Sequence, residues 1–158
     1  MIRTGIGYDC HRLVAGRRLV LGGIELQSER GLEGHSDADV LTHAVIDALL
    51  GAAALGDIGQ HFPDTDERYR DASSIELLRQ TVENLAAHGY AIENVDATIM
   101  LERPHVSPVR DEIRSSLAGA LGLQVERVNV KATRGEGLGF VGHEEGAAAL
   151  AVATVTVA

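Results

Sequence analysis

The chain has 158 residues, of which 45% are hydrophobic, 23% charged and 3% aromatic. This length and composition predict one globular domain spanning residues 1–158, large enough to bury a hydrophobic core. The formal net charge of −9 argues against a nucleic-acid-binding protein, and the absence of an apolar run of about 18 residues argues against a membrane span.

The first predicted strand covers residues 2–8 and begins so early that it leaves no room for a signal peptide. The single cysteine, Cys10, excludes an intrachain disulfide, so we expect a cytoplasmic protein. Asp9 and His11 follow two residues apart and point to the same side of an extended chain, with Cys10 turned the other way into packing. A hairpin is predicted over residues 18–26, because two glycines supply the positive φ of its turn.

A polar loop over residues 28–35 leads into a helix predicted from about Asp37 to Ala54. Ser36 is the expected N-cap, and Asp39 completes a capping box. His43 lies one turn further along, on the same face as Asp39. Free backbone N–H groups at this helix N-terminus would suit an anion such as phosphate.

Asp9, His11 and His43 together form a set of two histidines and one carboxylate. Three protein ligands with one open position are typical of catalytic zinc sites, whereas structural zinc sites use four. Such residues are common in chains of this length. The pattern alone therefore leaves open an ordinary solvated or buried role for each of them.

Residues 56–66 read as a loop rich in glycine and aspartate. A second helix opens with a capping box from Ser73 to Glu76 and ends before Gly89. A strand is predicted over residues 95–101, followed by a loop over residues 102–106.

Ser107 and Pro108 start a third predicted helix, which Gly122 ends. A strand over residues 127–133 and a glycine-rich loop over residues 134–143 follow. The segment 147–157 favours a strand, although its alanines leave a helical start open. Because helices alternate with strands, we expect an at least partly parallel sheet with helices covering one or both faces.

In this order, the motifs resemble the 2-C-methyl-D-erythritol 2,4-cyclodiphosphate synthase family along the whole chain. The resemblance implies an α+β fold, a mixed four-stranded sheet with helices packed on one face, assembled as a homotrimer with active sites between subunits. The matching segments are residues 7–11, 35–40 with His43, 47–59, 62–66, 94–96, 129–133, and Glu136 with residues 138–140.

The same resemblance implies a lyase of the non-mevalonate pathway of isoprene biosynthesis. This enzyme cyclises 4-diphosphocytidyl-2-C-methyl-D-erythritol 2-phosphate, a small cytidine diphosphate substrate, to 2-C-methyl-D-erythritol 2,4-cyclodiphosphate and releases CMP. Asp9, His11 and His43 would bind Zn²⁺, and Glu136 would hold a second divalent cation, Mg²⁺ or Mn²⁺.

The resemblance also implies roles for individual side chains. His35 and Arg134 take the catalytic positions, and His35 and Ser36 contact phosphate. Residues 57–59 and 62–66 would line the methylerythritol pocket, whereas residues 101–107 and 133–136 would come from the adjacent subunit. The implied substrate-binding residues are Ser36, Asp57, Ile58, Gly59, Phe62, Pro63, Asp64, Thr65, Asp66, Leu101, Glu102, Arg103, Pro104, Thr133 and Phe140.

The glycine-rich loop departs from the family pattern. Arg134 stands where a threonine is usual, and we expect it to contact phosphate, with a solvent-facing side chain as the alternative. His143 replaces a usual arginine and His105 a common lysine, so no role is transferred to either histidine. Two other functions stay open: a zinc-dependent phosphohydrolase, and a non-catalytic trimeric isoprenoid-diphosphate-binding protein.

Overall fold

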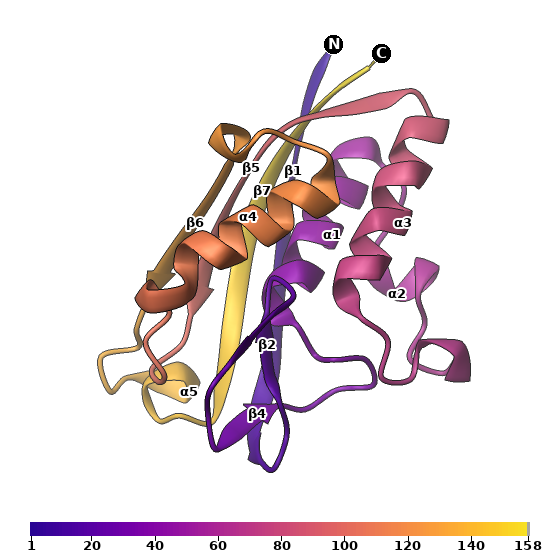
Figure 1. Cartoon of the computed structure of the whole chain (residues 1–158). Helices are drawn as coiled ribbons and strands as arrows, with labels where there is room; N and C mark the ends of the chain where they lie inside the picture. Colours follow the sequence, from indigo (N-terminus) through magenta and orange to yellow (C-terminus); the bar gives the residue numbers. More distant parts are fainter. Residues whose placement is uncertain (158) are drawn as a thin grey trace.

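The computed structural model describes residues 1–157 and arranges them as a mixed five-stranded sheet with helices packed against it (Figure 1). Strands β5 and β6 pair in parallel, and the other neighbours in the sheet are antiparallel. A separate hairpin joins β2 (Leu19–Leu21) to β3 (Ile24–Leu26), as predicted. The sheet contains, in spatial order, β4 (Arg30–Leu32), β1 (Ile2–Ala15), β7 (Gly146–Val157), β5 (Tyr90–Met100) and β6 (Val128–Thr133).

The expected count of four strands is wrong by one. Strand β4 lies in the segment predicted to be a polar loop and pairs with the end of β1, where Leu32 lies opposite Leu13. Leu32 is fully buried, so this short segment joins the sheet because of its tertiary packing, although its neighbours in the sequence are polar. The predicted mixture of helices and strands is otherwise present.

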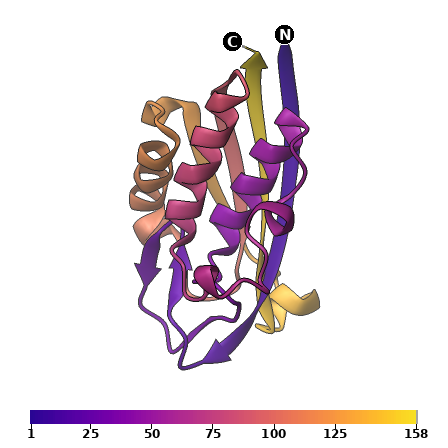
Figure 2. The same ribbon diagram turned by 90° about the vertical axis from the view of Figure 1, so that its right-hand side faces the viewer.

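The long helices α1 (Val40–Ala53), α3 (Ser74–Ala87) and α4 (Arg110–Leu121) lie on one face of the sheet (Figure 2). Alternate residues of β7, from Ala149 to Val155, are buried beneath them, which follows from the two-residue period of a strand. Shorter helical segments connect the main elements: α2 (Ile58–His61), α5 (Gly139–Gly142) and the 3₁₀ turns η1 (Glu67–Tyr69), η2 (Ser107–Val109) and η3 (Val125–Arg127).

Helix α1 approaches β1 so closely that only glycine fits between them. A Cβ atom at Gly7 would lie 1.9 Å from the carbonyl oxygen of Ala44, and one at Gly5 would lie 2.1 Å from that of Ala48. Real Cβ atoms do not come this near to a backbone oxygen. This contact brings His43, next to Ala44 on the helix, over Asp9, two residues beyond Gly7 on the strand.

The predicted start of this helix is wrong. Asp39, and not Ser36, is the N-cap, and its Oδ1 accepts the N–H of Thr42 at 3.0 Å. Ala38 has a φ of 57°, so the chain turns between Ser36 and the first helical residue. Since Asp39 takes the Thr42 N–H, that donor is not free for an anion as predicted.

The buried Asp39 also joins the hairpin to the helix. Its carboxylate accepts the backbone N–H groups of Gly22 at 2.9 Å and Gly23 at 2.8 Å. Burial raises the pKa of this carboxyl, although the hydrogen bonds from Thr42 and Gly22 oppose that change. Asp39 is therefore a structural residue that holds the loop before α1 in place.

Other boundaries also differ from the predictions. Strand β1 continues to Ala15, so Asp9 and His11 lie within the strand and not after it. Strand β5 begins at Tyr90, and the C-terminal segment is a strand from Gly146 onward. The third long helix begins at Arg110, after the turn η2.

Two smaller predictions have opposite outcomes. Gly122 has a left-handed φ of 67° and ends α4, as predicted. Cys10 is exposed, so its predicted packing role is wrong for this chain. Among residues 1–157, no helix combines the length and the apolar character needed to cross a bilayer.

Candidate active site

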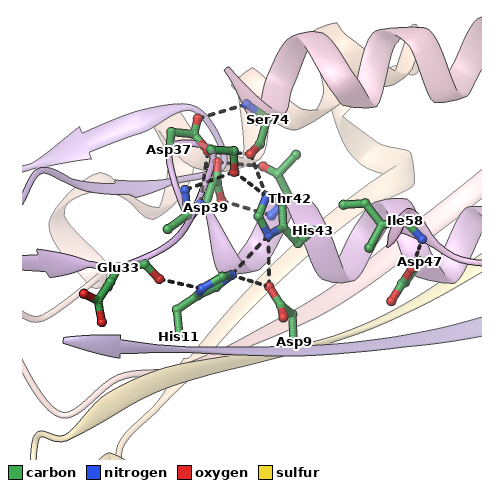
Figure 3. Close-up of polar contacts among 12 residues, drawn as sticks. Asp9, His11, Glu33, Asp37, Asp39, Thr42, His43, Asp47, Ile58 and Ser74 are labelled. Carbon is green, nitrogen blue, oxygen red and sulfur yellow. Dashed lines mark hydrogen bonds and ion pairs between the residues drawn. The ribbon is translucent and has the colours of Figure 1, made fainter. Parts of the chain in front are cut away.

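Three side chains from β1 and α1 converge at one point, as Figure 3 shows. Asp9 Oδ2 lies 2.9 Å from His11 Nε2 and 3.0 Å from His43 Nδ1. The two histidine nitrogens are 3.2 Å apart. The predicted grouping of these residues is therefore present, because the strand places Asp9 and His11 on one side and the helix supplies His43.

The hydrogen-bond partner of His11 determines which of its nitrogens carries the proton. Its Nδ1 lies 2.8 Å from the carbonyl oxygen of Glu33, which can only accept a hydrogen bond. The proton of the neutral ring therefore sits on Nδ1, and the lone pair of Nε2 faces Asp9. A carboxylate oxygen and a bare ring nitrogen at this distance need a positive charge between them.

The three facing atoms fit a divalent metal ion. In a tetrahedral zinc site with bonds of about 2.0–2.1 Å, the ligand atoms lie about 3.3–3.4 Å apart. The separations here, 2.9 to 3.2 Å, are close to that value. An ion with three such ligands keeps one coordination position open for another molecule.

The pKa values of Asp9 and His11 show the same attraction for positive charge. Burial alone would raise the pKa of Asp9, but the hydrogen bonds and charges of His11 and His43 outweigh it and lower that pKa to about 2. Burial alone would lower the pKa of His11, but its pairing with Asp9 outweighs the burial and raises it. Protons and metal ions therefore compete for the same place.

A cavity of about 380 Å³ opens beside the cluster. It brings together the three metal-ligand candidates with the predicted catalytic His35 and most of the predicted methylerythritol pocket. Tyr69 and Leu77 line it as well, and no sequence pattern pointed to them. The predicted residues on its wall are Asp9, His11, His35, Ser36, His43, Ile58, Gly59, Phe62, Pro63 and Asp64.

Asp57, Thr65 and Asp66 do not belong to this cavity wall. Asp57 caps α2, where its Oδ1 accepts the N–H of Gln60 at 3.0 Å. The carbonyl oxygen of Asp66 lies 3.0 Å from Nε2 of His35. In this chain, Asp57 and Asp66 shape the loop that carries the pocket residues.

Most of the remaining predicted residues lie at a second place, around the loops after β5 and β6. Glu102 is buried, and its carboxylate accepts two hydrogen bonds of 2.8 Å, one from the guanidinium of Arg134 and one from the backbone N–H of Gly135. The Arg134 hydrogen bond lowers the pKa of Glu102. Leu101 donates its N–H to the carbonyl oxygen of Thr133 at 3.1 Å, which ties the two loops together.

Neighbouring residues complete this second region. Arg103 and Pro104 line another cavity, of about 550 Å³, together with Arg30 and His105. Glu136 is exposed, has a φ of 53° and lies outside the three-residue ligand group in the described chain. The structure thus brings most of the predicted residues together in two separate groups, whereas the exposed Phe140 lines another cavity with Cys10 and His11.

Comparisons with known proteins agree with the sequence resemblance. The sequence profile of the YgbB family matches residues 2–156. A 2-C-methyl-D-erythritol 2,4-cyclodiphosphate synthase from Salinibacter ruber (strain DSM 13855 / M31) is 60% identical over 154 residues, covering 98% of each chain. These matches do not support the phosphohydrolase or the non-catalytic binding protein.

Solved structures share the fold. The bifunctional IspDF from Campylobacter jejuni matches with a TM-score of 0.96 and 40% identity, over 100% of this chain and 43% of that longer one. A 2C-methyl-D-erythritol-2,4-cyclodiphosphate synthase described as a CDP-bound form matches with a TM-score of 0.90 and 37% identity, over 98% of this chain and 100% of that one.

Proposed function

Because the chain belongs to the YgbB family, we propose that it converts 4-diphosphocytidyl-2-C-methyl-D-erythritol 2-phosphate into 2-C-methyl-D-erythritol 2,4-cyclodiphosphate and CMP. It is a lyase of isoprenoid precursor biosynthesis. The observation that carries this proposal is the convergence of one carboxylate oxygen and two ring nitrogens on the wall of a pocket. These atoms belong to Asp9, His11 and His43.

We propose that Asp9, His11 and His43 hold Zn²⁺ and that Glu136 holds Mg²⁺ or Mn²⁺. Bound divalent ions supply Lewis-acid chemistry and neutralise phosphoryl charge. Local cations are needed because the chain carries a net charge of −9, which repels an anionic substrate at long range. Arg134 lies on the loop that carries Glu136, where its side chain is paired with Glu102 at 2.8 Å.

The reaction requires positioning more than proton transfer by the chain. The attacking group is the substrate's own 2-phosphate, whose second pKa is about 6, so it is mostly dianionic at neutral pH. The side chains therefore need only hold two phosphoryl groups in line. His35 and Ser36 line the pocket, which is compatible with the proposed phosphate contact, and Phe62 packs edge-on against Tyr69 with ring centroids 5.4 Å apart.

A homotrimer would bring the two groups of residues together. Ile6, Tyr8, Leu150 and Val152 are 39 to 70% exposed and form an apolar patch that we call the sheet-face patch. In the antiparallel register, Ile6 lies opposite Val152 and Tyr8 opposite Leu150, so all four share one face. Apolar patches of this kind mark protein interfaces, and we propose that two further copies of this chain cover it.

We also propose a cytoplasmic location. The support is the single cysteine of the chain, Cys10, whose free thiol would persist in a reducing compartment.

Phosphorus NMR tests the reaction directly. The purified protein is incubated with the cytidine diphosphate substrate, Zn²⁺ and Mg²⁺, and the expected products are CMP and a cyclic diphosphate, both absent after chelation. His88→Ala is the matched control, because His88 is exposed and bonds only locally, to the carbonyl of Asn84. CMP with a linear phosphate product, or no product from a zinc-loaded trimer, would contradict the proposal.

A further inference from the structure

The far nitrogen of His43 contacts two serines, of which Ser74 was not indicated by any sequence motif. His43 Nε2 lies 2.8 Å from the hydroxyl oxygen of Ser74 and 3.2 Å from that of Ser36. Ser74 makes a second hydrogen bond from its hydroxyl to Asp37 Oδ1, and its N–H donates to Asp37 Oδ2 at 2.9 Å. Figure 3 shows this chain of contacts above the Asp9–His11–His43 cluster.

The direction of each hydrogen bond follows from the number of protons available. A serine hydroxyl has a single hydrogen, and a carboxylate can only accept. The hydrogen of Ser74 is therefore committed to Asp37, and Ser74 can only accept from His43. Ser74 is fully buried, so water does not compete for these contacts.

We propose that Asp37 and Ser74 are positioning residues that place the proton of His43 on Nε2 and so leave the lone pair of Nδ1 free for a metal ion. The inference rests on the proposed metal-dependent function. Outer partners of this kind fix the ring orientation of metal-bound histidines. The carbonyl of Glu33 does the same for His11, but Ser74 acts through a side chain and can be tested by substitution.

The hydrogen bonds that run from Asp37 through Ser74 to His43 also connect separate elements. Ser74 is the first residue of α3, Asp37 lies in the loop before α1, and His43 is on α1. The bond from the N–H of Ser74 to Asp37 fixes the start of α3 against that loop. The orientation of the His43 ring is therefore determined by the packing of two helices and not by α1 alone.

The test compares zinc affinity in Ser74→Ala, Asp37→Asn and Ser73→Ala by competition with a chelator. We expect Ser74→Ala to lose about 10- to 100-fold in affinity, the usual effect of removing an outer partner. Asp37→Asn should lose a similar factor, because an amide can donate to Ser74 and reverse the hydrogen bond to His43. Ser73→Ala is the matched control, since Ser73 is exposed and its side chain makes no capping bond.

Nitrogen-15 NMR of the unsubstituted zinc-loaded protein provides a second readout that needs no variant. The expected result is a proton on His43 Nε2. A proton on Nδ1, or a zinc affinity of Ser74→Ala equal to that of Ser73→Ala, would overturn the inference.

The same measurements separate this inference from the proposed function. If zinc binds and its affinity depends on Ser74 but no cyclic diphosphate forms, the inference stands and the proposed reaction fails. If the unsubstituted protein binds no zinc, both fail.

Discussion

At the Asp9–His11–His43 cluster, one carboxylate oxygen and two ring nitrogens face one another within 3.2 Å. At the Glu102–Arg134 pair, by contrast, each carboxylate oxygen of Glu102 already accepts a hydrogen bond. The first group is built on a strand and a helix, and the second on two loops. Both groups concentrate charge, but only the first needs a cation from outside to be stable. This contrast separates a binding centre from a contact that holds two loops together.

The largest effect is expected from removing a ligand of the first group. His43→Ala should lose bound zinc and reduce turnover by more than about 100-fold, because losing a ligand costs more than losing an outer partner. Metal analysis and turnover are measured together, with His88→Ala as the control. Full activity in zinc-free His43→Ala protein would show that the cluster is not the metal site.

The second prediction tests the proposed trimer contact and changes no residue of the metal-ligand cluster or of the Glu102–Arg134 pair. Val152→Glu places a charge on the sheet-face patch and should convert the proposed trimer into monomers, because burying an unpaired charge is costly. We expect activity to fall by at least about 10-fold while zinc stays bound, since Asp9, His11 and His43 come from a single chain. Light scattering gives the oligomeric state. A trimer that survives this substitution would rule out the patch as the interface.

The third prediction concerns the close contact between α1 and β1, which positions the Asp9–His11–His43 cluster. Gly7→Ala should destabilise the fold by about 1–3 kcal/mol or more, because the new methyl group has no room against the carbonyl of Ala44. Thermal unfolding measures the change. Gly119→Ala, in α4, is the matched control: nothing lies within 4 Å of its Cβ position, and a stability gain of about 0.5–1 kcal/mol is expected there. Equal stabilities of the two variants would show that α1 can move away from β1.

A smaller effect is expected at the second group. Arg134→Ala should reduce turnover by about 10-fold, the effect of one hydrogen bond to a charged group, and leave the Tm nearly unchanged. Folding is spared because Glu102 keeps its bond from the N–H of Gly135. Turnover and Tm of Arg134→Ala and Glu102→Gln are compared. Unchanged kinetics in Arg134→Ala would mean that this arginine serves only the loop contact.

The smallest effect is a dependence of Tm on pH in the metal-free protein. The folded pKa of Asp9, about 2, is below its usual 3.8, so its contribution is present above about pH 4 and is lost as the pH falls toward 2. The pKa of His11 is raised above 6.5, so its contribution is complete below pH 6.5 and is lost as the pH rises through the raised value.

Metal-free protein should therefore gain most stability from this pair between about pH 4 and 6.5, a shift of a few degrees in Tm. Zinc replaces the protons, so the zinc-loaded protein should keep its Tm at higher pH. Identical pH profiles with and without zinc would contradict this competition.

The sequence predicted the metal-ligand candidates because the two-residue period of a strand and the 3.6-residue period of a helix determine which side chains point the same way. Asp9 and His11 point to the same side of any extended chain, so their grouping was predicted correctly although the strand was expected to end at residue 8 and continues to Ala15. His43 was placed on its helix even though the start of that helix was wrong. Errors of a few residues at element ends leave such short-range patterns intact.

Long-range contacts could not be read in this way. Ser74 lies 31 residues from His43, and only the packing of α3 brings its hydroxyl to the ring. Leu32 enters the sheet because of where β1 ends, which the local polar composition does not reveal. Asp37 carried a partial signal, since it lies in the charged run before α1, but its acceptor role depends on Ser74.

The backbone contact of α1 with Gly5 and Gly7 has a consequence for dynamics. Helix and strand interlock without a layer of side chains between them, so α1 cannot detach locally without exposing the strand beneath it. The amides of β1 and α1 should exchange with deuterium as one cooperative unit, and a metal ion held by Asp9, His11 and His43 would bridge the two elements and slow exchange throughout that unit. The residence time of the metal would then be limited by the rate at which the centre of the fold opens.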